Sequence, residues 1–156
     1  MNTFTHRLFL TAAVAATTLT ALPAAHASSV ATRDEAVAMV KKAIAFAKAN
    51  GKDKMLAEVN AKAAQFVDRD LYIYVADEKG LVLAHAVNPK LVGRDLTQLK
   101  DADGKPFVTE ILKIAASDKP GWVEYRWPNP VTKQIDDKVT YVEKVDGVVY
   151  CAGVYK

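Results

Sequence analysis

Two neighbouring segments carry the side chains best suited to binding a small molecule. Residues 121–130 read GWVEYRWPNP and hold both tryptophans of the chain with a tyrosine between them. Residues 138–145 read KVTYVEKV and add a lysine and a further tyrosine. Tyrosine and tryptophan combine an apolar ring with a polar tip, and a lysine ammonium pairs with anions. Together these residue types could form a ring-lined site for a small acid.

Two interpretations of these segments remain open. In an extended strand, Tyr125 and Trp127 share one face, where they either fill the core against a helix or line a pocket. Lys138 is either solvated at the start of its strand or turned inward toward an anion. Pro128 and Pro130 end the preceding strand, because proline cannot donate a ladder hydrogen bond.

Other chemistries find little support in the sequence. His85 is the only histidine after residue 27 and Cys151 is the only cysteine, so a zinc site would lack ligands. The motifs of nucleophilic, zinc-protease, phosphate-binding and haem-attachment sites are absent. Residues 99–110 carry acids at calcium-loop spacing, but Leu99 occupies the first ligand position and Pro106 interrupts the loop. We therefore expect no enzyme, cofactor or metal site, and we expect Cys151 to be a buried strand residue.

The first residues predict export from the cytoplasm. A positively charged start, an apolar run over residues 8–22 and the triplet Ala25-His26-Ala27 are typical of a secretory signal peptide. The apolar run is shorter than the roughly 20 residues that cross a membrane as a helix. We expect cleavage after Ala27, a periplasmic protein with no membrane insertion after cleavage, and one domain over residues 28–156. The formal net charge of +3 is spread without a basic block, so nucleic acid is not an expected partner.

The periodicity of the chain predicts an α+β domain. Residues 32–35 have capping-box spacing, and helical periodicity continues to residue 66 as a long or broken helix. A turn-rich connection, residues 87–105, is long enough to suggest a lid, and Pro106 is placed to be the first residue of a second helix. We expect an antiparallel sheet of five strands, at residues 71–75, 81–86, 122–127, 138–145 and 148–155.

In five segments that follow one another, the chain resembles the single Cache domain family, a group of extracytoplasmic sensor domains of chemoreceptors and histidine kinases. The segments are YIYVADEKGLVLAHAVNPKLVGRDL, DADGKPFVTEIL, GWVEYRWPNP, KVTYVEKV and the closing GVYK. They cover about residues 70–156, and the predicted helical residues 32–66 lie N-terminal to them, where members of the family have their long helix. The order of the segments makes the resemblance specific.

The resemblance implies a PAS-like antiparallel sheet with a long N-terminal helix on one side and a ligand pocket under a loop or helix lid on the other. It implies binding of a small organic acid such as acetate, propionate, lactate or pyruvate, without catalysis. The ligand-binding residues that it implies are Tyr74, His85, Tyr125, Trp127, Lys138 and Tyr141, with Arg94 in the lid as a further candidate.

The family's usual receptors add transmembrane helices and a cytoplasmic output domain, which we do not find here. We therefore expect a free-standing periplasmic binding module that passes its bound state to a separate membrane receptor or kinase. The alternative is a protein-interaction module, an accessory subunit of a membrane sensor or signalling system.

Overall fold

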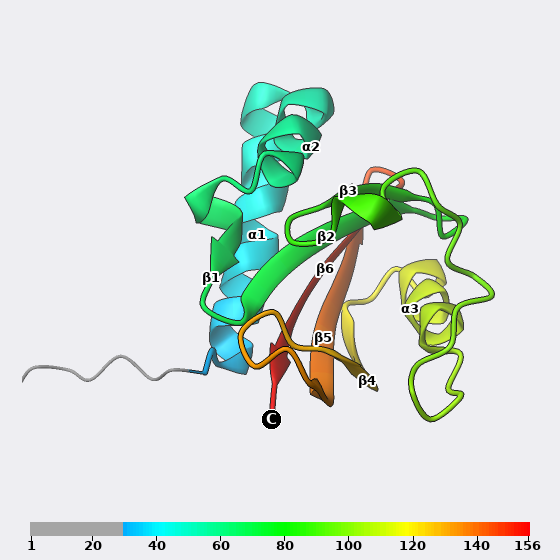
Figure 1. The fold of residues 1–156 in the computed structure, drawn as a ribbon. Coiled ribbons are helices and arrows are strands. Elements are labelled where there is room, and N and C mark those ends of the chain that lie inside the picture. The colour runs from blue at the N-terminus through cyan, green and yellow to red at the C-terminus, as the bar shows by residue number, and fades with distance from the viewer. Residues whose placement is uncertain (1–29) are drawn as a thin grey trace, which may run out of the picture.

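The strands pair into one antiparallel sheet with helices on both faces (Figure 1). The computed structural model describes residues 30–156, so the predicted signal peptide and its cleavage site after Ala27 lie outside the described residues. The order across the sheet is β1-β2-β6-β5-β4, and β3 also pairs with β2. The strands are β1 (Val67–Asp68), β2 (Leu71–Asp77), β3 (Val82–His85), β4 (Gly121–Pro128), β5 (Ile135–Val145) and β6 (Val148–Tyr155).

The predicted α+β fold with five antiparallel strands is thus confirmed, and the two-residue β1 is added to it. The hairpin between β5 and β6 closes at Asp146-Gly147, whose φ angles are 52° and 72°. A two-residue turn of this type needs positive φ at both positions, which Asp-Gly supplies at little cost. This turn fixes the register of the two longest neighbouring strands, with Val145 opposite Val148.

Two helices form the N-terminal layer, α1 (Arg33–Asn50) and α2 (Lys52–Asn60). The expected capping box is present, since the Thr32 side chain accepts from the Glu35 amide and the Glu35 side chain accepts from the Thr32 amide. Gly51, at a φ of 92°, separates the helices, so the predicted long or broken helix is broken. The buried residues of α1 recur at helical spacing and pack on β2, β5 and β6.

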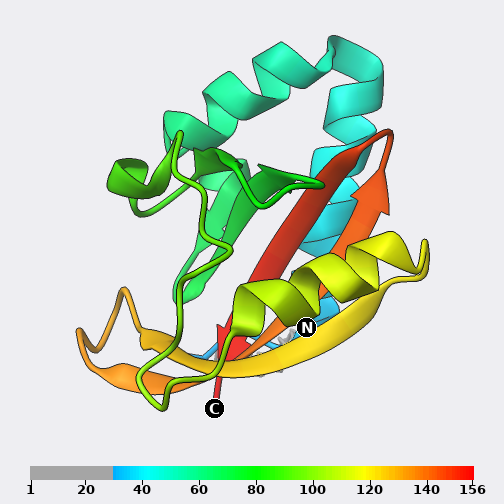
Figure 2. The ribbon, with the colours of Figure 1, turned by 90° about the vertical axis from the view of Figure 1, so that its right-hand side faces the viewer.

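The opposite face of the sheet carries α3 (Phe107–Ala116), which packs on β4 and β5 (Figure 2). Pro106 directly precedes this helix, one position earlier than predicted. The connection over residues 87–105 runs from the end of β3 to the start of α3. Helix α3 contributes Phe107 and Ile111 to a second apolar cluster, which includes Cys151. Cys151 is fully buried in β6, which confirms its expected place.

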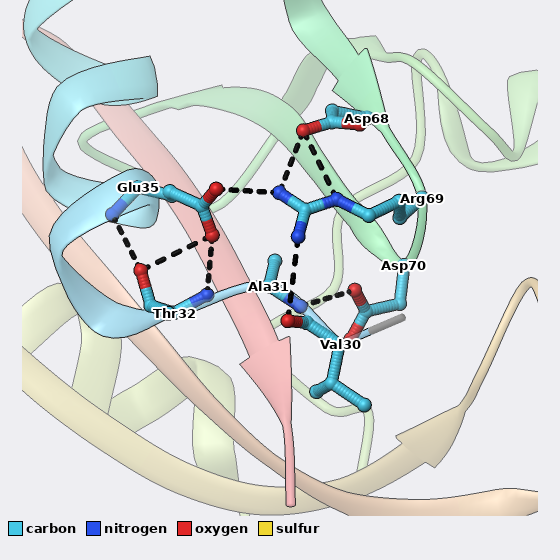
Figure 3. Close-up of polar contacts among 7 residues, drawn as sticks. All are labelled: Val30, Ala31, Thr32, Glu35, Asp68, Arg69 and Asp70. Carbon is cyan, nitrogen blue, oxygen red and sulfur yellow. Dashed lines mark hydrogen bonds and ion pairs between the residues drawn. The ribbon is translucent and has the colours of Figure 1, made fainter. Parts of the chain in front are cut away.

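Charged groups attach the residues in front of α1 to the corner between β1 and β2 (Figure 3). The Arg69 guanidinium donates to the Glu35 carboxylate at 2.6 Å and to the carbonyl of Val30 at 3.4 Å. The amide of Ala31 donates to Oδ1 of Asp70 at 2.9 Å, and Asp70 is buried. We call these contacts the N-terminal clamp. Within residues 30–156 no helix combines the length and the apolar character that a membrane crossing requires.

Candidate functional site

The site lies on the α3 side of the sheet, where strand alternation collects aromatic residues. Tyr74 pairs with His85 across β2 and β3, and Tyr125 pairs with Lys138 across β4 and β5. Directly paired residues of an antiparallel sheet point to the same face. Side chains of β2, β3, β4, the connection and α3 enclose a cavity of about 30 Å³ on this face. The aromatic groups lining it are Tyr72, Tyr74, His85, Phe107, Tyr125 and Trp127.

A wider opening of about 290 Å³ adjoins this cavity and shares Tyr72, His85 and Trp127 with it. Its other walls come from residues 87–88 and from the β4–β5 turn at residues 128–133. Because three residues line both spaces, the opening lies at the mouth of the enclosed cavity. A small molecule in the opening would contact these three aromatic residues between β3 and the β4–β5 turn.

Lys138 is the charged residue of the site, and it is 1% exposed. Its Nζ lies 3.8 Å from the centroid of the Tyr72 ring and 4.8 Å from that of Tyr155. It forms no salt bridge with a carboxylate of the described residues. Burial lowers the pKa of Lys138 well below the ordinary value of a lysine, and the nearby Cys151 and Asp70 offset part of this effect. The two rings provide cation–π contacts, but an anionic partner is missing.

Asp70 is the buried carboxylate whose charge acts on Lys138. Its Oδ1 accepts from the Ala31 amide, whereas its Oδ2 is buried without a hydrogen-bond partner. It forms no salt bridge with Lys138. Asp70 therefore does not give Lys138 a direct ion-pair partner.

His85 provides a neutral proton donor. Its Nδ1 accepts from the amides of Asn88 at 3.0 Å and Val87 at 3.3 Å, so the ring proton is on Nε2. Burial, with the charge of Lys138 as a second cause, lowers the pKa of His85 to about 3. The ring stacks on Tyr74 at a centroid distance of 5.7 Å. Packing therefore fixes the ring while Nε2–H stays available.

Tyrosines complete the polar lining. The Thr140 hydroxyl donates to the Tyr125 hydroxyl at 3.0 Å, and the Tyr125 ring stacks on Phe107 at 4.2 Å. Burial raises the pKa of Tyr125 well above its ordinary value, as it does for Tyr72 and Tyr74. The Tyr155 hydroxyl donates to the carbonyl of Pro128 at 2.8 Å and lies 3.3 Å from the Tyr72 hydroxyl. The phenols therefore stay protonated. Since Tyr155 donates to Pro128 and Tyr72 to Tyr155, it is the Tyr125 hydroxyl that keeps its proton for an anion.

The structure brings together five of the seven residues implied by the resemblance, namely Tyr74, His85, Tyr125, Trp127 and Lys138. The first four line the enclosed cavity, whereas Lys138 does not line it but contacts the ring of Tyr72, which does. Lys138 and Tyr125 line a separate groove of about 250 Å³.

The structure does not bring Tyr141 or Arg94 to this cluster. Tyr141 lies on the α1 side of the sheet, because it is one residue from Thr140 in a strand of two-residue period. There it packs on Trp122 at 5.2 Å and donates to Glu143 at 2.9 Å. Arg94 is exposed, and its Nε donates to the carbonyl of Lys90 at 2.8 Å.

Tyr72 and Tyr155, whose rings contact Lys138, were not among the residues expected in the site. Strand alternation would have placed Tyr72 with Tyr74, and the Asp146-Gly147 turn would have placed Tyr155 opposite Lys138. In the segment with calcium-loop spacing, Asp101 binds backbone amides instead, those of Lys105 at 2.8 Å, Asp103 at 2.9 Å and Arg126 at 3.0 Å. No group of three or more metal-ligating side chains occurs in the part of the chain that the structure describes.

Comparison with known proteins agrees with this fold. The model of the family Single Cache domain 2 matches residues 10–153. Over 90 residues the chain is 33% identical to the methyl-accepting chemotaxis protein McpP of Pseudomonas putida, an alignment that covers 56% of this chain and 16% of that receptor. The chain therefore spans less than a fifth of the receptor's length.

Two solved structures share the fold. A methyl-accepting chemotaxis protein from Vibrio parahaemolyticus superimposes with a TM-score of 0.68 at 22% identity, over 79% of this chain and 87% of that one. A Cache chemosensory domain, whose structure explains its recognition of carboxylic acids, gives a TM-score of 0.61 at 26% identity, over 78% and 86% of the two chains.

Proposed function

Because the chain belongs to the Single Cache domain 2 family of chemosensory ligand-binding domains, which have no catalytic function, we propose that it binds a small organic carboxylate on the α3 side of its sheet. The observation that carries the proposal is the buried ammonium of Lys138, which has aromatic neighbours but no salt-bridge partner among the described residues. Burial disfavours the charged form of this lysine, and a bound carboxylate would favour that form by pairing with the ammonium.

The other polar groups of the site suit the same ligand. An ionised carboxylate only accepts hydrogen bonds. The protonated phenol of Tyr125, which accepts from Thr140, and the Nε2–H of His85 can both donate. A cluster of proton donors around one cation favours an anion over a neutral or cationic ligand.

The size of the cavity supports a short monocarboxylate. One water needs about 10–15 Å³ of accessible space, and the enclosed cavity measures about 30 Å³. This room for about two to three waters, extended by the adjoining opening, favours short acids, so two- and three-carbon acids such as acetate, propionate, lactate or pyruvate are the proposed ligand class. A dicarboxylate would place a second negative charge among apolar walls without a second buried cation.

We further propose a periplasmic module that passes its ligand-bound state to a separate membrane receptor or kinase. The predicted signal peptide supports the compartment. The alternative, an accessory subunit that acts by contact alone, draws on Val131 and Ile135, which are exposed near the mouth of the site. Co-purification with a membrane protein without any response to acids would favour the alternative.

A thermal-shift series with these four acids tests the proposed function. Ligand at 100 times its Kd stabilises a protein by about 2.7 kcal/mol. We expect at least one acid to raise the Tm, and Lys138→Met to abolish the shift while the unliganded Tm is kept or raised, because the change removes a buried charge and keeps the stem. Tyr141→Phe is the matched control, since Tyr141 faces α1, and it should keep the full shift.

Fluorescence gives a second readout, because Trp127 lines the cavity and Trp122 lies on the α1 side. Ligand should change the emission, and Trp127→Phe should reduce the response. The proposal is refuted if no acid shifts the Tm at millimolar concentration, or if Lys138→Met binds as well as the wild type.

A further inference from the structure

The path of the Lys138 side chain depends on a position without a side chain. Lys138 lies in β5, and the Tyr72 ring beneath its ammonium belongs to β2. Strand β6 lies between these two strands. Neighbouring strands are about 4.8 Å apart, so the lysine must extend across β6 to reach Tyr72. It crosses at Gly153, which is paired with Tyr72 on one side and with Thr140 on the other.

A methyl group at position 153 would occupy this path. A Cβ built on Gly153 lies 2.5 Å from Cε of Lys138 and 2.3 Å from Oγ1 of Thr140. Non-bonded carbon atoms separate to about 3.5–4.0 Å, so both side chains would have to move. The backbone of Gly153 does not have a positive φ, so its conformation does not demand glycine. Position 153 requires glycine because a side chain there would have no room.

Gly153 differs from its neighbours on the same face of β6. Val149, Cys151 and Tyr155 occupy the same face of the strand, and each of them carries a side chain. Gly153 alone leaves a gap on this face, and the gap coincides with the lysine. The Thr140 hydroxyl at its border bonds to Tyr125, so the gap touches two groups of the ligand site.

We propose that Gly153 is a positioning residue of the ligand site: its missing side chain opens the passage across β6 that places the Lys138 ammonium over Tyr72. The inference rests on the proposed function for its meaning, because the ammonium is the proposed partner of the carboxylate. It adds that ligand affinity depends on a residue with no atom to offer the ligand.

The structure also indicates where a displaced lysine would go. Lys138 already borders the open groove of about 250 Å³, whose walls include Asp101, Glu124 and Asp137. A Cβ at position 153 blocks the way toward Tyr72 and leaves the way into this groove free. The ammonium would then meet water and carboxylates outside the site.

Amine labelling tests the displacement without any ligand. In native wild-type protein, an amine-acylating reagent should leave Lys138 unmodified while exposed lysines react, as read by peptide mass spectrometry. In Gly153→Ala, Lys138 should become labelled at a rate similar to that of exposed lysines. Gly121→Ala is the matched control: it is another strand glycine, and the three atoms nearest to its added Cβ all belong to the Ile114 side chain, at 3.1–3.3 Å. There Lys138 should stay protected. Equal protection of Lys138 in wild type and Gly153→Ala overturns the proposal.

A double-mutant cycle covers the case in which Gly153→Ala folds poorly. In a Lys138→Ala background the lysine stem is gone, so the Tm loss caused by Gly153→Ala should be smaller than in wild type. In a Thr140→Ala background it should also be smaller, because the added Cβ lies 2.3 Å from Oγ1 of Thr140. An equal loss with and without the lysine shows that Gly153 does not act through Lys138 and overturns the proposal.

The affinity for an acid tests whether Gly153 affects the ligand site. For an acid that binds wild type, Gly153→Ala should weaken affinity at least tenfold, which is about 1.4 kcal/mol, and Gly121→Ala should not. If no acid binds wild type, the proposed function fails, while the labelling and the cycle still decide the role of Gly153. Unchanged affinity in a folded Gly153→Ala overturns the positioning role.

Discussion

Acidification from about pH 7.5 to about pH 5.5 should destabilise the unliganded protein through His85 by about 1.4 kcal/mol. The folded-state pKa of His85 is about 3, against an ordinary value of 6.5. Below pH 6.5 the unfolded chain therefore takes up a proton that the folded chain does not. The free energy of unfolding falls by about 1.4 kcal/mol for each further pH unit until the folded pKa is reached. The whole difference corresponds to about 5 kcal/mol near pH 3.

The physical cause is visible at the ring. Protonation would place a hydrogen on Nδ1, which already faces the amides of Val87 and Asn88, and would add a second positive charge near Lys138. His85→Asn is the informative variant, because the Asn oxygen can accept from the same amides and does not titrate. Its stability at neutral pH will be lower, since it leaves part of the ring's volume empty. Only the change with pH is compared.

Urea unfolding followed by tryptophan fluorescence at the two pH values measures the effect. Wild type should lose about 1.4 kcal/mol more than His85→Asn between them. His85 is the only histidine after residue 27, so an imidazole NMR titration of tag-free processed protein reports on it alone. A ring that titrates near pH 6.5 in the folded protein, or equal pH dependence in both proteins, refutes the reasoning.

Two further expectations concern the fold. Cys151 is fully buried, and burial raises the pKa of its thiol to about 12. A thiol reagent should therefore modify the native protein slowly and the denatured protein at once. Rapid labelling of the native protein would contradict the place of Cys151 in β6. Thr32→Ala removes the side chain that caps α1 and should lower the free energy of unfolding by about 1 kcal/mol, as measured by urea unfolding. An unchanged free energy of unfolding would show that the observed capping box contributes little.

Much of this sheet could be predicted from local patterns. Asp146-Gly147 defines a two-residue hairpin, and counting back from it pairs Lys138 with Tyr155, as observed. Alternation within one strand separates Tyr141 from Lys138 and unites Tyr72 with Tyr74. The same rule, applied strictly, would have excluded Tyr141 from the site and included Tyr72.

Long-range pairing lay beyond such patterns. The position of β6 between β2 and β5 joins residues about eighty positions apart, and no local periodicity encodes that neighbour relation. Without it, neither the contact of Lys138 with Tyr72 nor the space at Gly153 can be inferred. Arg94 shows a second limit, since loop composition does not tell which way a side chain points. Its Nε bonds to the preceding turn and the group stays in solvent.

The N-terminal clamp has a practical consequence for where an isolated domain can be cut. A fragment starting at Thr32 would keep all of α1 but lose the Ala31 amide, which donates to Asp70 Oδ1. Since Oδ2 is already without a partner, the carboxylate would then be buried with both oxygens unsatisfied unless water enters. Such a loss costs about 1–3 kcal/mol. Recombinant fragments and domain fusions should therefore be joined ahead of Val30, a boundary that the predicted cleavage after Ala27 respects.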